Sequence, residues 1–168
     1  MNGSNRSKSQ ALARPRPLPD IAVLADGILA GAIAAALFAL YFLAVDVWRA
    51  EALATPSLVA AVVLQGASPL ATVAVDLGLV GAFSLVHAAL FAGFGVVVSC
   101  LVSRMRALPA LPLLALGCFL ALESGFLAAA SLFAPGLGAA IGHGFVAAGN
   151  ALAASAVAVY LRYARSGS

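Results

Sequence analysis

Three ionisable side chains lie well inside apolar stretches of this 168-residue chain: His87, Glu123 and His143. Imidazole and carboxylate ligands suit Zn, Fe or Cu, so these three residues are a candidate metal site. His87 and His143 are also candidate ligands of a b-type haem, with Asn150 on the same helical stripe as His143. Glu123 by itself is a candidate for passing a proton or an ion, because ionisable groups inside a membrane are costly to keep there.

A purely structural role is the alternative for the same residues. Glu123 and a histidine would satisfy one another across two helices and hold them in register, a contact worth about 0.6 kcal/mol on average in membranes. The three residues are scattered and form no ligand motif, and the chain has no Walker A, H-E-x-x-H or C-x-x-C sequence. We therefore expect no enzyme, and the cofactor stays open between none, a transition metal and haem b.

Composition places these residues in a membrane protein. Hydrophobic residues make up 64% of the chain and charged residues 9%, where soluble domains carry about 25% charged residues. This excludes a soluble enzyme domain, a disordered chain and a disulfide-rich secreted module. The net charge is +3, but the basic residues sit at the ends of apolar runs, where membrane proteins keep their topology signals. No nucleic-acid partner is expected.

Four apolar segments are long enough to span a bilayer, which needs about 20 helical residues. They cover about 27–47, 77–102, 108–133 and 137–161. Because the runs do not alternate apolar and polar residues, a strand barrel is excluded. The predicted fold class is an all-α membrane protein, an antiparallel bundle of four transmembrane helices.

Lys and Arg are distributed unevenly between the two ends of these spans. The N-terminal tail 1–26, which is also Pro-rich, has four, and the loop after the second span and the C-terminal tail 162–168 have two each. The connection 49–76 has only Arg49, and the loop after the third span has none. The positive-inside rule therefore places both termini in the cytoplasm and the connection 49–76 outside. Trp48, Tyr160 and Tyr163 fall at span ends, as interfacial aromatic residues do.

The outer connection 49–76 contains a helix-start signal, with Thr55 as N-cap and Pro56 at the first helical position. The apolar run that follows is too short to cross, so a short helix is expected to lie on the outer leaflet or to fold over the bundle as a lid. Ser68 and Pro69 repeat this helix-start signal, so the helix of the second span can also begin there and project above the membrane. Asp46, near the outer end of the first span, is placed to join the polar residues from above.

The estimated distances of the polar residues from the outer ends of their spans place them at a similar depth in the membrane. His87 and Glu123 lie about ten residues from the outer ends of their spans, or roughly 15 Å, and His143 lies about six residues in, or roughly 9 Å. Small residues spaced by four, such as Gly31 and Ala35 or Ala89 and Gly93, would let helix backbones approach closely. Such spacing serves packing within the chain or against a partner.

Several short motifs resemble those of a loosely defined set of small bacterial inner-membrane proteins. They are a first span ending in Asp46, Thr-Pro-Ser-Leu at 55–58, Leu-Val-His at 85–87 and Gly-Asn-x-Leu-Ala at 149–153. The resemblance implies a four-span protein of the bacterial inner (cytoplasmic) membrane and carries no activity.

The function expected from this reading is a non-catalytic integral membrane subunit. It would pack against other membrane protein subunits of a larger complex, one of electron transfer or transport, because almost no mass lies outside the bilayer. The alternative is a protein that handles a metal, haem b or protons within the membrane through His87, Glu123 and His143.

Overall fold

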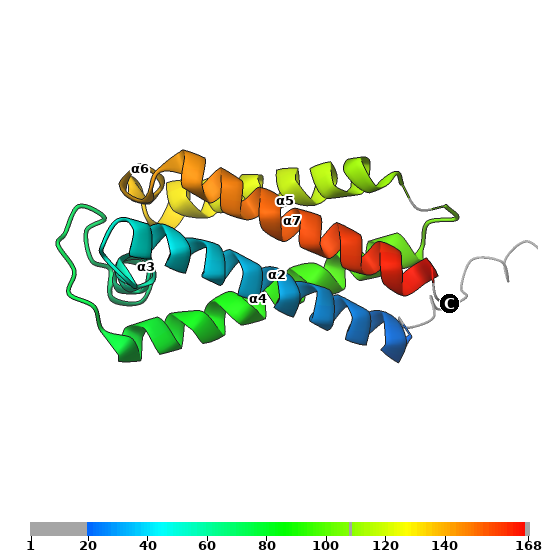
Figure 1. Ribbon diagram of the computed structural model, residues 1–168, viewed down its shortest axis with the longest axis horizontal. Coiled ribbons are helices and arrows are strands. Elements are labelled where there is room, and N and C mark those ends of the chain that lie inside the picture. The colour runs from blue at the N-terminus through cyan, green and yellow to red at the C-terminus, as the bar shows by residue number, and fades with distance from the viewer. Residues whose placement is uncertain (1–19, 108, 167–168) are drawn as a thin grey trace, which may run out of the picture.

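The computed structural model describes residues 20–107 and 109–166, and every element in those ranges is a helix (Figure 1). The helices are α2 (Ile21–Trp48), α3 (Ala54–Gln65), α4 (Leu77–Ser103), α5 (Leu111–Phe133), α6 (Leu137–Ile141) and α7 (His143–Ser166). Most of the tail predicted over 1–26, the start of the predicted third span at 108 and the last two residues of the tail 162–168 lie outside the described residues.

The four long helices, α2, α4, α5 and α7, have 23 to 28 residues and are long and apolar enough to cross a membrane. At 1.5 Å per residue even α5 spans about 35 Å, which exceeds the hydrocarbon thickness of about 30 Å. The prediction of an all-helical chain with four helices suited to a membrane is confirmed.

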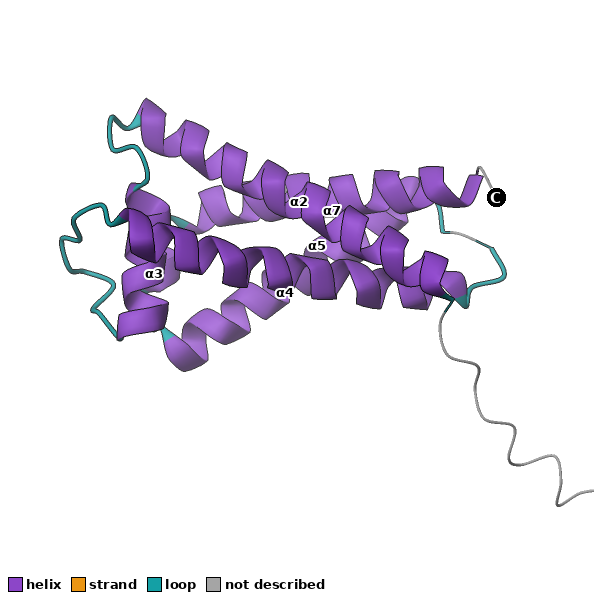
Figure 2. Cartoon of the chain, turned by 90° about the horizontal axis from the view of Figure 1, so that it is seen from below, coloured by secondary structure: helices purple, strands orange, loops and turns teal. Residues whose placement is uncertain are grey.

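The long helices pack side by side with successive members running in opposite directions (Figures 1 and 2). α4 packs on α2, α2 on α7 and α7 on α5, so that α2 and α7 are the two inner members of the row. Over the described residues α4 and α5, although consecutive in the chain, make at most marginal contact. We call the end where α2 begins and α7 ends the tail end, and the opposite end, which carries α3 and α6, the α3 end.

The contact between α2 and α4 brings two backbones together. A Cβ atom at Gly27 would lie 2.5 Å from the Cα atom of Val96, and one at Gly31 would collide with the carbonyl oxygen of Phe91. From the other side, a Cβ atom at Gly95 would collide with the carbonyl oxygen of Gly27. Only glycine fits at these three positions, and such small residues are what lets helices associate closely in lipid. The sequence-predicted pair Ala89 and Gly93 takes no part, since both are exposed.

The contact between α2 and α7 is made of alanine and one inserted ring. Ala30 and Ala34 of α2 and Ala153 of α7 are completely buried in the same cluster. Gly149 of α7 makes room for Phe38 of α2, whose ring would lie 2.9 Å from a Cβ atom there. α2 thus presents small residues to both of its neighbours.

The α3 end is covered by α3 and α6, with α3 running across the ends of the long helices (Figure 2). Val62 of α3, Leu137 and Ile141 of α6, and Phe42 of α2 form one buried cluster there. α3 therefore packs over the ends of the long helices.

The start of α3 is held by a carboxylate from α2. Asp46, only 1% exposed, accepts hydrogen bonds from the backbone N–H of Thr55 at 2.8 Å and from its hydroxyl at 2.5 Å. A carboxylate at a helix N-terminus satisfies free N–H groups and is favoured by the helix dipole. The N-cap position belongs to Leu53, so the expectation that Thr55 is the cap is wrong by two residues. Asp46 is used for this contact instead of joining the polar residues further down.

Other helix boundaries differ from the predicted spans for local reasons. α2 begins at Ile21 and so takes Asp26 into the helix. α4 begins at Leu77, not at Ser68, because Asp76 caps it by accepting from the N–H groups of Gly78 and Leu79. The segment predicted as one span over 137–161 is broken at Gly142, where φ is +97°, a value that L side chains rarely adopt.

The glycine contact between α2 and α4 gives a direct test of the packing. Replacing Gly31 by leucine forces side-chain atoms into the backbone of α4, and we expect the free energy of unfolding to fall by about 3 kcal/mol. Gly93→Leu, on the open face of the same helix pair, is the matched control and should change it by less than about 0.5 kcal/mol. Reversible unfolding in detergent micelles measures both, and equal effects of the two substitutions would contradict the assigned interface.

Candidate functional site

The structure places His87 between α4 and α2, in a group of phenylalanine rings. Its ring centroid lies 4.6 Å from that of Phe91, 5.2 Å from Phe38 and 5.9 Å from Phe83. The Nε2 atom is buried and has no hydrogen-bond partner among the described residues. The imidazole is therefore held by ring packing and by a backbone hydrogen bond at Ala35, and no acidic side chain of the described residues is bonded to it.

Glu123 and Asn150 form the polar contact between α5 and α7. The side-chain amide of Asn150 donates a hydrogen bond of 2.8 Å to Oε2 of Glu123. Asn150 is 4% exposed, whereas Glu123 is half-buried at the edge of the contact. Glu123 does make a polar contact between two helices, but the expectation that a histidine is its partner is wrong. The amide of Asn150 takes that place because α7, not α4, is the helix that packs against α5.

His143 is the first residue of α7 and is exposed. Its ring folds back on α6, where Nε2 would lie 2.7 Å from a Cβ atom at Gly138. The break at Gly142 ends the helix that would have carried His143 deeper, so the residue starts a new helix at the α3 end. Seven residues further along α7, Asn150 is buried in the row.

These positions do not assemble the predicted metal or haem site. His87 faces α2, Glu123 faces α7, and His143 lies at the surface against α6. Over residues 20–107 and 109–166 no three His, Cys, Asp or Glu side chains come together as a group that could hold a metal ion. His87 and His143 do not face one another, as two axial haem ligands would. The geometry thus offers no support for either cofactor on His87, Glu123, His143 and Asn150.

These residues hold helices together, and they leave one oxygen of the Glu123 carboxylate without a partner in the described chain. The bond to Asn150 engages one oxygen of Glu123, and the other has no hydrogen-bond partner among the residues that the structure describes. A carboxylate exposed at this depth in a bilayer is expensive unless a donor or water reaches it. Glu123 therefore keeps one carboxylate oxygen able to accept a hydrogen bond from outside the described chain.

A second polar group, at the tail end, was not singled out from the sequence. The hydroxyl of Tyr160 donates to Asp26 across α7 and α2 at 3.5 Å, and Arg165 donates to the carbonyl oxygen of Val102 at 2.6 Å. The sequence alone places Asp26 and Arg165 in the two tails and Tyr160 at a span end. The sequence signal that could have identified Asp26 is its position directly before Gly27. Gly27 and Gly31 mark the side of this helix that packs against other helices.

Comparison with known proteins finds no family model, no curated protein and no solved structure that matches this chain.

Proposed function

We propose that the chain is a non-catalytic integral membrane subunit that packs against another membrane protein through the open side of α5. The observation that carries this proposal is how little of α5 the chain itself covers. Among the residues of α5 only Cys118 is buried, and of the long helices only α7 packs closely against it. α5 therefore offers a whole helix side to its surroundings.

The uncovered side of α5 carries a line of small residues of the kind found where helices pack together in membranes. We call the following exposed residues the α5 stripe: Gly117, Ala121, Ser124, Ala128 and Ser131. Their spacing of four and three residues keeps them on one line along the helix. Exposed leucines, among them Leu116, Leu120 and Leu127, form a ridge along one side of the stripe. Small residues beside a ridge suit a second helix, because backbones can approach there.

Glu123 adds a polar group to the same region. It lies at the edge of the contact with α7, close to the leucine ridge, with one oxygen unengaged within the described chain. A donor from a partner subunit would satisfy that oxygen, and such polar contacts between helices add to association in membranes. The proposal therefore assigns the outer side of α5 to a partner in a larger membrane complex, one of electron transfer or transport.

Co-purification tests this assignment. We expect Ala121→Leu to fill the α5 stripe and to lower the amount of partner that purifies with the chain at least about tenfold, with the thermal stability of the chain unchanged. Ala89→Leu, an alanine exposed on α4, is the matched control and should retain the partner. Native electrophoresis of gently solubilised membranes measures both variants. A native protein that always migrates alone at monomer size would contradict the proposal.

Handling of a proton or an ion by Glu123 is the second candidate. It is favoured by the half-exposed carboxylate, whose one described partner is a neutral amide. An ionisable group in that setting can exchange a proton when water or a cation reaches it. The oxygen of Glu123 that Asn150 does not engage can accept a proton, just as it can accept a hydrogen bond from a partner subunit.

Flux in proteoliposomes separates the second candidate from the first. If Glu123 carries a proton, Glu123→Gln should abolish pH-driven flux, because an amide cannot be protonated and deprotonated in this range. Asp76→Asn, at the exposed cap of α4, is the control and should leave flux intact. Flux that is absent in the native chain, or that persists in Glu123→Gln, counts against ion handling.

We also propose that the tail end faces the cytoplasm of a bacterial cell and that the chain lies in its inner membrane. Arg104 and Arg106 follow α4 at this end, and Arg162 and Arg165 lie in the last turns of α7. The opposite end carries Arg49, whose guanidinium lies 4.4 Å from the ring centre of Phe145 and is thereby packed against the protein. This asymmetry is the one that the positive-inside rule requires.

Reporter fusions test the orientation. A fluorescent protein that matures only in the cytoplasm should be bright when fused after Ser168 and dark when inserted after Gly66, in the connection between α3 and α4. A periplasmic phosphatase at the same two sites should give the opposite pattern. The orientation is wrong if the phosphatase is active at the C-terminus.

A further inference from the structure

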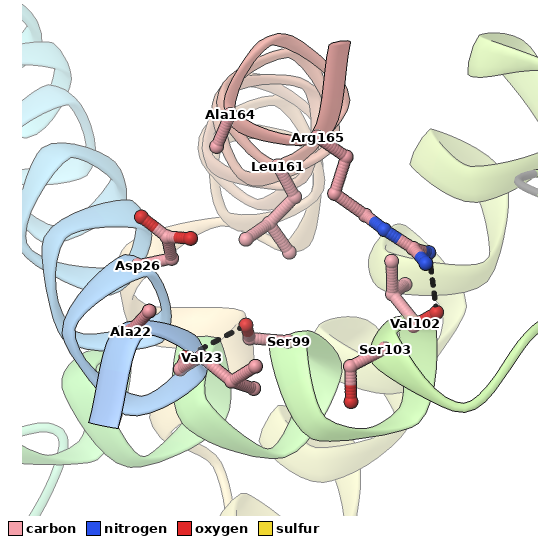
Figure 3. A pocket seen from close by; sticks show the side chains of 9 residues that line it. All are labelled: Ala22, Val23, Asp26, Ser99, Val102, Ser103, Leu161, Ala164 and Arg165. Carbon is pink, nitrogen blue, oxygen red and sulfur yellow. Dashed lines mark hydrogen bonds between the residues drawn. The ribbon is translucent and has the colours of Figure 1, made fainter. Parts of the chain in front are cut away.

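A cavity of about 370 Å³ opens between α2, α4 and α7 at the tail end, away from the open side of α5 (Figure 3). Its walls combine apolar side chains, among them Val23, Val102 and Leu161, with the charged groups of Asp26 and Arg165. The cavity lies where α2 begins and where α4 and α7 end. In a helix row that crosses a bilayer, this is the level of the lipid headgroups.

The two charges stand on opposite sides of the cavity. Figure 3 shows the carboxylate of Asp26 on α2 and the guanidinium of Arg165 on α7, with the cavity between them. Each group is engaged by a neutral neighbour: Arg165 donates to the carbonyl oxygen of Val102, and Asp26 accepts from Tyr160. A guanidinium has five N–H donors and a carboxylate about four acceptor positions, so both keep capacity for a ligand.

The presence of both charges on its walls restricts what the cavity can hold. A simple anion would gain from Arg165 but would be repelled by Asp26, and a simple cation would meet the reverse. A molecule that carries both a negative and a positive group would satisfy both sides at once. Apolar chains attached to such a molecule would contact Val23 and Leu161, which line the same cavity.

We propose that this cavity binds the phosphoethanolamine headgroup of a membrane phospholipid, with the phosphate on Arg165 and the ammonium on Asp26. Arginine recognises phosphate through paired N–H donors, and an ammonium donates three hydrogen bonds that a carboxylate accepts. Ser99 supports the wall of the site by donating to the carbonyl oxygen of Val23 at 2.8 Å, which ties α4 to α2 beside the cavity. The inference does not depend on the partner proposed for α5.

Lipid titration of the purified full-length chain in detergent tests the proposal, with bound lipid counted by native mass spectrometry. The three probes are phosphatidylethanolamine, phosphatidylglycerol with the same acyl chains, and water-soluble phosphoethanolamine. We expect phosphatidylethanolamine to bind about tenfold more tightly than phosphatidylglycerol, which lacks the ammonium. Binding of soluble phosphoethanolamine as tight as that of the lipid would overturn the assignment to a lipid.

Two substitutions separate the two ends of the headgroup. Asp26→Asn should remove the preference for phosphatidylethanolamine over phosphatidylglycerol, and Arg165→Gln should weaken both lipids about tenfold. Asp20→Asn and Arg162→Gln, exposed charges near the same helix ends, are the matched controls and should bind as the native chain does. A preference that survives Asp26→Asn would overturn the proposal.

A third variant keeps the test valid if the charge substitutions fail to fold. Ala22 lines the cavity and is itself exposed, so Ala22→Phe fills the space while both charges stay in place. We expect this variant to lose phosphatidylethanolamine binding and to keep its helical content by circular dichroism. A folded Ala22→Phe chain that binds the lipid as tightly as the native chain would show that the cavity is not the site.

Discussion

The small size of the residues that α2 presents to α4 and α7 is the feature on which the rest of the structure depends. In lipid there is no hydrophobic drive between helices, so they associate through close packing and polar contacts. Gly27 and Gly31 give α4 access to the backbone of α2, and the alanines on another face of α2 do the same for α7. Because α2 has a neighbour on each of these faces, α4 and α7 are positioned relative to one another through α2.

This arrangement explains why the polar residues pair as they do. With α4 on one side of α2 and α5 beyond α7, His87 and Glu123 belong to different helix contacts. Each contact then deals with its own polar group: rings surround His87, whose Nε2 atom stays without a hydrogen-bond partner in the described chain, Asn150 binds Glu123, and Thr55 binds Asp46. Every unpaired polar atom is costly in a low-dielectric environment, so the hydrogen bonds to Glu123 and Asp46 stabilise the contacts in which they lie.

The same arrangement leaves two surfaces that the chain does not use for itself. α5 is an outer helix and exposes a line of small residues, and the tail end holds a cavity with two opposed charges. The two surfaces involve different helices and different chemistry, close packing in one case and charge recognition in the other. Both proposals therefore concern contacts with the surroundings, a neighbouring subunit for α5 and a lipid headgroup for the cavity, rather than a reaction within the chain.

The sequence by itself determined that the chain is helical and suited to a membrane, because length and apolar composition of the four runs suffice for that. It also singled out Glu123 and Asn150 as polar residues inside spans, since such residues are rare in lipid. It could not determine which helices are neighbours, because side-chain spacing describes one helix at a time. Only the tertiary structure decided that α2 and α7 lie between α4 and α5, that His143 follows a break at Gly142, and that Asp26 and Arg165 line one cavity.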